Sequence, residues 1–286
     1  MKNEILVFLK HMRIHYQVMI LSGPFLLGGI FSNQTTLTEF IIQYLNIHIL
    51  LAGSVTVFNS YYDKDYEQRK PIGGMKSPPP IKYWMLLTSL VLSIISLSIS
   101  FLSGWIFFSL VLAGIIFSFL YSHENFRMKE KPVQSILIIV ITGAIFPFIW
   151  GFISFGGGET SINTLLAIIG IVFLAGSFYP VSQIFQIESE KNKSLAASLG
   201  VKHVKRFFNI SFISGLVLIS LSFLEFGKIS ACLFLISGIT ALIIENFIIL
   251  KDITPTYESY NKIMLSKYLG GILISVFLIV MMLEGN

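Results

Sequence analysis

Residues 38–67 read TEFIIQYLNIHILLAGSVTVFNSYYDKDYE, an apolar stretch that ends in amide and carboxylate side chains. Residues 38–59 are long enough to cross a bilayer as one helix. At its end Asn59, Asp63 and Glu67 follow one another at intervals of four, so on an α-helix they share one stripe. Carboxylates are costly beside hydrocarbon, so such a row indicates a bound cation or a strong polar partner. A solvated acidic helix end is the competing interpretation.

The composition is that of a membrane protein. Of 286 residues, 54% are hydrophobic and only 12% are charged, against about 25% charged in soluble domains. The net charge is +5, and the basic residues lie between apolar runs, which indicates membrane topology and no nucleic-acid partner. The single cysteine, Cys232, excludes an internal disulfide or a cysteine metal cluster.

Further apolar runs predict an all-α membrane protein with nine transmembrane helices. Each run approaches the length that a bilayer requires. They lie near residues 14–32, 38–59, 83–103, 105–121, 133–155, 161–183, 207–226, 229–250 and 264–283.

The basic residues alternate between the two ends of these spans and predict their orientation. Lys228 is the one basic residue in the connections expected outside, and the other lysines and arginines fall on the opposite side. The positive-inside rule therefore places the N-terminus in the cytoplasm and the C-terminus outside. We expect one multi-pass domain over 1–286, in the plasma membrane if the protein is bacterial. Its cytoplasmic loops near 60–82 and 184–206 would cap an active site on that face.

A second polar stripe follows the sixth predicted span. Ser182, Gln186 and Glu190 repeat the spacing of the first stripe, four spans later. Two facing rows of oxygen ligands suit Mg²⁺, which often bridges carboxylates to substrate phosphate. An amphipathic helix end dipping into water is the alternative for this segment.

A basic pair lies between the two stripes in the sequence. Arg127 and Lys129 follow Tyr121-Ser122 in the loop after the fourth span. A guanidinium and an ammonium group this close together can grip an anion. Charge that only sets the topology is the alternative explanation.

A few polar residues lie within or beside the predicted spans. His48 and Glu245 are candidates for function because intramembrane ionisable groups often are, although a satisfied interior role explains them better. Arg13, His15 and Gln17, at the start of the first span, are expected to border a cytoplasmic cavity.

These motifs together resemble the UbiA superfamily of intramembrane prenyltransferases over essentially the whole chain. The resemblance implies a polyprenyl diphosphate whose tail lies among the helices, and a lipophilic or aromatic acceptor. It implies that Mg²⁺ promotes departure of the diphosphate and formation of an allylic carbocation. It assigns Asn59, Asp63 and Glu67 to one Mg²⁺, Gln186 and Glu190 to a second, and Arg127 and Lys129 to the diphosphate.

Two departures from the family pattern matter. Gln186 stands where the second stripe usually has an aspartate, which predicts weaker binding of the second ion, and neighbouring Glu188 points to a different helix face. The first stripe ends in Glu67 instead of aspartate, and Ser60 and Asp65 alter its surroundings. Three alternatives stay open: a variant with weakened or lost transferase activity, a cation-coupled transporter and a membrane scaffold.

Overall fold

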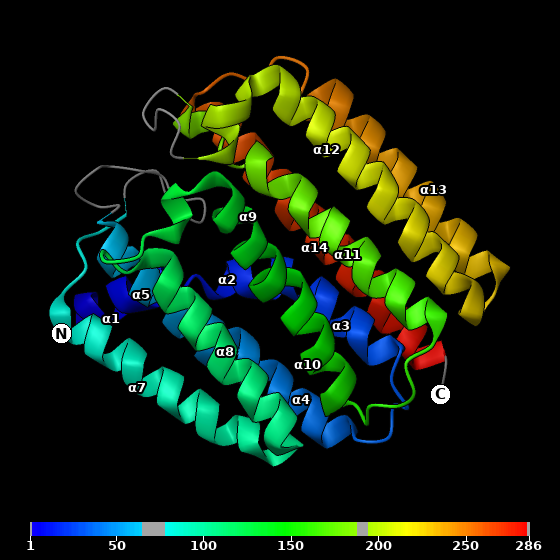
Figure 1. Ribbon diagram of the computed structural model, residues 1–286, viewed down its shortest axis with the longest axis horizontal. Coiled ribbons are helices and arrows are strands. Elements are labelled where there is room, and N and C mark those ends of the chain that lie inside the picture. Colours follow the sequence, from blue (N-terminus) through cyan, green and yellow to red (C-terminus); the bar gives the residue numbers. More distant parts are fainter. Residues whose placement is uncertain (1, 65–77, 188–193, 285–286) are drawn as a thin grey trace. The chain divides into compact units, whose positions relative to one another are not determined.

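The computed structural model describes residues 2–64, 78–187 and 194–284, and throughout these ranges the regular elements are helices (Figure 1). Within these ranges, seven helical stretches have the length and apolar character to cross a membrane. They are Leu37–Asp63, Tyr83–Ser122, Pro132–Ser154, Ile162–Gln186, Leu195–Phe226, Lys228–Ile249 and Tyr257–Leu283.

Three predicted spans differ from this set for a structural reason. The stretch Tyr83–Ser122 contains α7 (Tyr83–Ser100) and α8 (Gly104–Ser122), which turn back on one another where Gly104 has a φ of 87° (Figure 1). The predicted span 14–32 consists of three short consecutive segments: α2 (Ile14–Tyr16), the π-helical η1 (Gln17–Leu21) and α3 (Ser22–Ile30). The count of nine stays a prediction.

The chain divides into two compact units, each described here by itself. The first comprises Met1–Met128, Phe146–Gly157 and Gly271–Asn286. In it α3 lies very close to α10 (Phe146–Ser154). A Cβ added to Gly28 would strike the carbonyl oxygen of Phe148, and a Cβ added to Gly151 would strike the carbonyl oxygen of Phe25. Small residues allow such close approach between membrane helices. The single domain predicted over 1–286 is not tested by this division.

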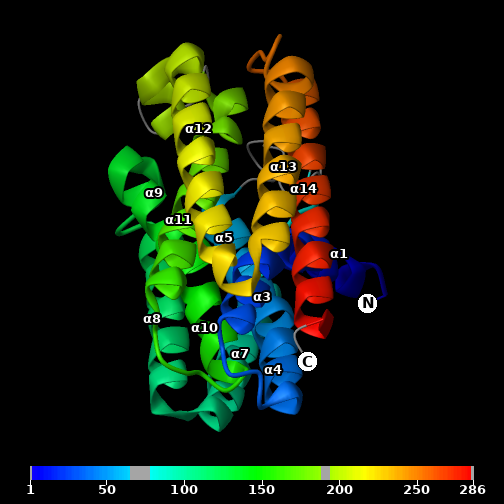
Figure 2. The ribbon, with the colours of Figure 1, turned by 90° about the vertical axis from the view of Figure 1, so that its right-hand side faces the viewer.

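The second unit comprises Lys129–Ile145 and Gly158–Gly270. Here α11 (Ile162–Val181) packs on α12 (Leu195–Ser222), where a Cβ on Gly215 would lie 2.7 Å from the carbonyl oxygen of Gly170. Helix α12 also runs beside α13 (Lys228–Ile244) in both views (Figure 1, Figure 2). Glycine therefore permits close helix contacts in both units.

Some buried polar side chains inside the spans lie in π-helical segments. Segment η2 (Asn46–Leu51), between α4 (Leu37–Leu45) and α5 (Ala52–Asp63), holds buried Asn46 and His48, and η8 (Glu245–Ile249) begins with buried Glu245. His48 Nδ1 lies 2.9 Å from the carbonyl oxygen of Tyr44, one turn earlier. This contact supports a structural role for His48.

The region predicted as a loop over 184–206 is partly helical, so that prediction was wrong for its second half. Helix α12 begins at Leu195, where the N–H of Ala197 donates to Ser194 Oγ at 3.2 Å. Gly200, with a φ of 75°, then interrupts the helix. Serine at the N-cap satisfies a free N–H of the first turn, and glycine tolerates a positive φ.

Candidate functional site

The last turn of α5 carries the first polar stripe. Asn59 and Asp63 lie one turn apart on it, both half-buried, and Lys64 ends the helix with a φ of 52°. A left-handed residue stops an α-helix, so within the described residues the predicted stripe extends over Asn59 and Asp63. Glu67 and Asp65 lie outside the described residues.

The oxygens of this turn are sheltered from solvent. Asn59 Oδ1 is buried with no hydrogen-bond partner among the residues that the structure describes, and Asp63 Oδ1 is buried as well. A buried carbonyl oxygen without a donor is costly, so a ligand that accepts its lone pair would stabilise it. An amide and a carboxylate oxygen are ligands that Mg²⁺ prefers.

Arg127 packs against the same turn. Its Nη2 donates to the carbonyl oxygen of Tyr62 at 3.4 Å, immediately before Asp63 in the chain. The backbone N–H of Arg127 donates to the carbonyl oxygen of His123 at 2.9 Å, and the φ of Arg127, 41°, is left-handed. Tertiary structure thus brings Arg127 to the turn that carries Asp63, although the two residues are far apart in the sequence.

Aromatic rings surround this turn. Phe58 and Tyr62 have ring centroids 4.7 Å apart, and Tyr62 lies 4.8 Å from the ring of His123. His123 in turn stacks on Phe119 at 4.3 Å. The polar groups of α5 therefore border an aromatic wall contributed by α5 and the end of α8.

The second polar stripe has a different local structure. Helix α11 ends at Val181, and the following hydrogen bonds join residues three apart, as in Gln186 N–H to Gln183 O at 2.9 Å. Gln186 ends the short 3₁₀ segment η6 (Ile184–Gln186) and is half-buried. Ser182 and Gln186 are therefore not one turn apart on an α-helix, which corrects the predicted stripe. Glu190 and Glu188 lie outside the described residues.

The remaining predicted site residue, Lys129, lies in η4 (Met128–Glu130) at the start of the second unit and is half-buried. Asn59, Asp63 and Arg127 belong to the first unit, whereas Lys129 and Gln186 belong to the second. Within residues 2–64, 78–187 and 194–284, no three His, Cys, Asp or Glu side chains gather as a metal site.

Sequence reasoning found Arg13 only as a border residue and overlooked its partner. Arg13 Nη2 donates to Ser60 Oγ at 2.7 Å, beside Asn59. Gln17 instead bonds the carbonyl of Ala52 at 3.4 Å, and His15 is exposed. Gln183 Oε1 is a second buried oxygen without a partner in the described chain, for which the only sequence signal was its closeness to Gln186.

Comparisons with known proteins agree with this architecture. A model of the UbiA prenyltransferase family matches residues 19–260. A search of curated proteins found no match.

Solved structures show the same fold at low sequence identity. A UbiA homologue from Archaeoglobus fulgidus bound to GPP and Mg²⁺ is 19% identical, with a TM-score of 0.73 over 96% of this chain and 99% of that one. The apo UbiA homologue from Aeropyrum pernix K1 is 16% identical, with a TM-score of 0.68 over 92% and 97%. A digeranylgeranylglyceryl phosphate synthase is 18% identical, with a TM-score of 0.61 over 98% and 99%.

Proposed function

The chain belongs to the UbiA prenyltransferase family, and we propose that it transfers a polyprenyl group from an allylic diphosphate to a lipophilic or aromatic acceptor within the membrane. The observation that carries this proposal is the last turn of α5. Asn59 and Asp63 present oxygens there, and the Arg127 guanidinium lies against the same turn. Cation ligands beside an anion-binding group are what a metal–diphosphate complex requires.

The oxygens of α5 fit Mg²⁺. Asn59 and Asp63, with Glu67, would hold one ion, and Gln186 with Glu190 a second. When bound, Mg²⁺ supplies positive charge that neutralises the diphosphate and makes it a better leaving group. Solved structures of homologues support a role for Mg²⁺, since the Archaeoglobus protein was determined bound to GPP or to DMAPP together with Mg²⁺.

The basic residues orient and stabilise the leaving group. Arg127 is fixed by its bond to Tyr62, so its guanidinium needs little reorganisation to donate to diphosphate oxygens. Lys129 supplies a second positive charge as a compact ammonium group. Both are catalytic residues in this proposal because they contact the charge that develops as the carbon–oxygen bond breaks.

The aromatic wall beside the stripe protects the allylic cation. Phe58, Tyr62 and Phe119 keep water from the turn that carries Asn59 and Asp63. Aromatic faces also attract a cation electrostatically. Diphosphate leaves with the electron pair of the broken carbon–oxygen bond. The acceptor then attacks the resulting cation, the new carbon–acceptor bond forms, and the acceptor releases a proton.

The membrane topology that fits this function has nine spans and a site on the cytoplasmic face. Dividing Tyr83–Ser122 at Gly104 gives two spans, and the consecutive helical segments from Ile14 to Ile30 give one more. The basic residues of the intervening loops support a cytoplasmic N-terminus.

The purified protein in lipid nanodiscs tests the proposal. With GPP, Mg²⁺ and a lipid extract, we expect diphosphate release and a prenylated product by mass spectrometry. EDTA should abolish both, and added Mg²⁺ should restore them. Magnesium-dependent GPP binding without release would favour a variant that has lost transferase activity. Cation flux in proteoliposomes without any prenyl diphosphate would favour the transporter.

A further inference from the structure

We propose that α1 (Lys2–Met12), through His11 and the adjoining Arg13, positions the last turn of α5 relative to residues 78–82 and thereby sets the affinity of the first metal–diphosphate site. The inference rests on the proposed function. It assigns His11, in α1, and Arg13, directly after α1, as positioning residues that act through α5. Both residues lie before the matched family region.

One side of α1 is joined to α5. Thr56 Oγ1 donates to the carbonyl oxygen of Met12 at 2.9 Å, and Arg13 donates to Ser60 at 2.7 Å. Gly53 allows the approach, because a Cβ there would lie 2.7 Å from Met12 Cε. These contacts follow α5 up to the residue next to Asn59, so movement of α1 would be transmitted to the stripe.

The same helix is joined to the segment that leads into α7. His11 Nε2 lies 2.9 Å from the carbonyl oxygen of Pro79, and Lys82 forms an ion pair with Glu4. The rings of Phe8 and Trp84 lie 5.9 Å apart. Helix α1 therefore contacts both α5 and the start of α7.

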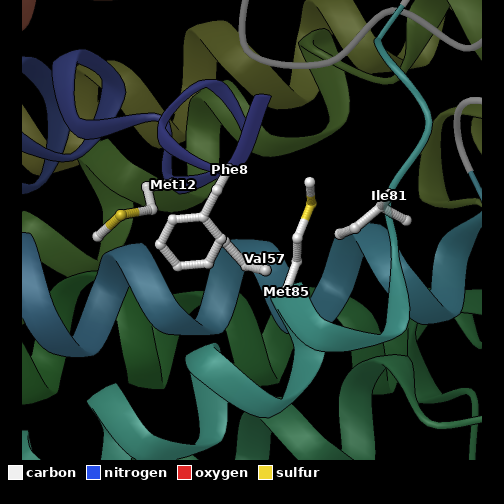
Figure 3. Close-up of a cluster of buried hydrophobic side chains, with 5 residues drawn as sticks. All are labelled: Phe8, Met12, Val57, Ile81 and Met85. Carbon is white, nitrogen blue, oxygen red and sulfur yellow. The ribbon is translucent and has the colours of Figure 1, made fainter. Parts of the chain in front are cut away.

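A buried apolar cluster holds these three segments together. Figure 3 shows side chains from α1, α5 and the start of α7 gathered in one place. Its members are Phe8, Met12, Val57, Ile81 and Met85. Because all five are at most 8% exposed, displacement of α1 would open apolar surface on both neighbours.

His11 makes a polar contact beside this apolar cluster, with the carbonyl oxygen of Pro79. The Pro79 carbonyl only accepts, so His11 Nε2 carries the proton and donates. Nδ1 is buried without a partner among the residues described, so the neutral ring fits the interface. Arg13 has a left-handed backbone, with φ 50° and ψ 41°, and turns the chain from α1 into α2. Its bond to Ser60 holds this turn against α5.

Variants at His11 separate positioning from a purely structural role. His11→Ala removes the donor, and His11→Gln keeps an N–H donor at about the same reach. We expect His11→Ala to raise the KM for GPP and the Mg²⁺ requirement about fivefold, the effect of one lost hydrogen bond, with kcat within about twofold. His11→Gln should restore both. The exposed His203 on α12 provides the matched control, and His203→Ala should behave as wild type.

Amide hydrogen exchange tests the same inference without catalysis. His11→Ala should speed exchange about fivefold in residues 60–64 as well as in 81–85, and His11→Gln should reverse this. Unchanged exchange in residues 60–64 would overturn the inference whether or not the protein is active. An active wild type whose KM is unaffected by His11→Ala would overturn it too. An inactive wild type with the predicted exchange would contradict the proposed function alone.

Discussion

The polar ends of α5 and α11 have the same spacing in sequence but different backbones. Helix α5 stays α-helical through Asp63, so Asn59 and Asp63 keep their one-turn relation until Lys64 ends the helix. Helix α11 ends at Val181 and continues into three-residue hydrogen bonds that leave Gln186 on a 3₁₀ segment. A four-residue spacing therefore produces a shared face only where the helix persists.

The two ends also differ in what holds them. Arg127 and Arg13 both donate to the last turns of α5, through the Tyr62 carbonyl and the Ser60 hydroxyl. At the other end, the rings of Phe185 and Tyr260 meet edge to face with centroids 4.7 Å apart, and Gln183 Oε1 is buried without a partner in the described residues. The α5 end is thus held by cations, and the α11 end by aromatic packing. We expect the first to dominate metal binding.

Loss of the α5 carboxylate should have the largest effect. Asp63→Asn keeps the side-chain volume and removes the charge, so Mg²⁺-dependent diphosphate release should fall at least about a hundredfold. Release of diphosphate from GPP measures this. The exposed Asp252, before α14 (Tyr257–Glu284), gives the matched control Asp252→Asn. Activity retained in Asp63→Asn would remove the α5 end from the metal site.

Neutralising Arg127, beside α5, should have the second-largest effect. Arg127→Gln should lower kcat/KM for GPP about a hundredfold, whereas Lys129→Gln should lower it about tenfold, because only Arg127 is fixed against the stripe. Steady-state kinetics at saturating Mg²⁺ measures both. Arg206→Gln on the exposed side of α12 serves as control. Equal losses at Arg127 and Lys129 would show that the fixed geometry is unimportant.

Restoring charge at the α11 end should have a moderate effect. Gln186→Asp should lower the Mg²⁺ concentration for half-maximal rate about threefold if Gln186 is a ligand, since a carboxylate binds the ion more strongly than an amide does. Gln186→Asn has the shape of the aspartate substitution without its charge, so it should not lower the Mg²⁺ concentration for half-maximal rate. A clear loss of activity in Gln186→Asp would argue against this position as a ligand.

The smallest expected effect is the pH dependence of stability that comes from His11, which contacts Pro79. Burial lowers the pKa of His11 below its ordinary value of 6.5; the Pro79 carbonyl opposes this shift and the charge of Arg13 adds to it. The unfolded chain then binds a proton that the folded one does not, so this contribution to stability is complete above about pH 6.5 and is lost as pH falls toward the lowered pKa. The apparent melting temperature of wild type should fall roughly 2 °C further than that of His11→Gln between pH 7.5 and 5. Parallel curves would contradict this.

Much of the fold was predictable because hydrophobicity and charge act locally. The apolar runs indicated membrane helices, and seven such stretches are present in the described parts of the chain. The boundaries were less predictable. The sequence around Leu195 reads as a polar loop, but a Ser194 cap starts a helix there, and the span near residue 14 contains a π-helical segment.

The site was predictable in residue type and only partly in geometry. The spacing of Asn59 and Asp63 holds because no left-handed residue intervenes before Lys64. The same spacing at Ser182 and Gln186 fails because α11 stops at Val181. The contact of Arg13 with Ser60 joins residues 47 apart, for which no local pattern provides a signal.

The sequence by itself determined that this is a helical membrane protein with oxygen-bearing and basic side chains beside its apolar runs, because composition and periodicity are properties of the chain alone. Only the tertiary structure decided that α5 keeps its stripe while the α11 end departs from it. It alone placed Arg127 on Tyr62 and α1 across α5 and the start of α7. The physical reason is that helix ends and long-range contacts depend on partners distant in sequence, which packing selects.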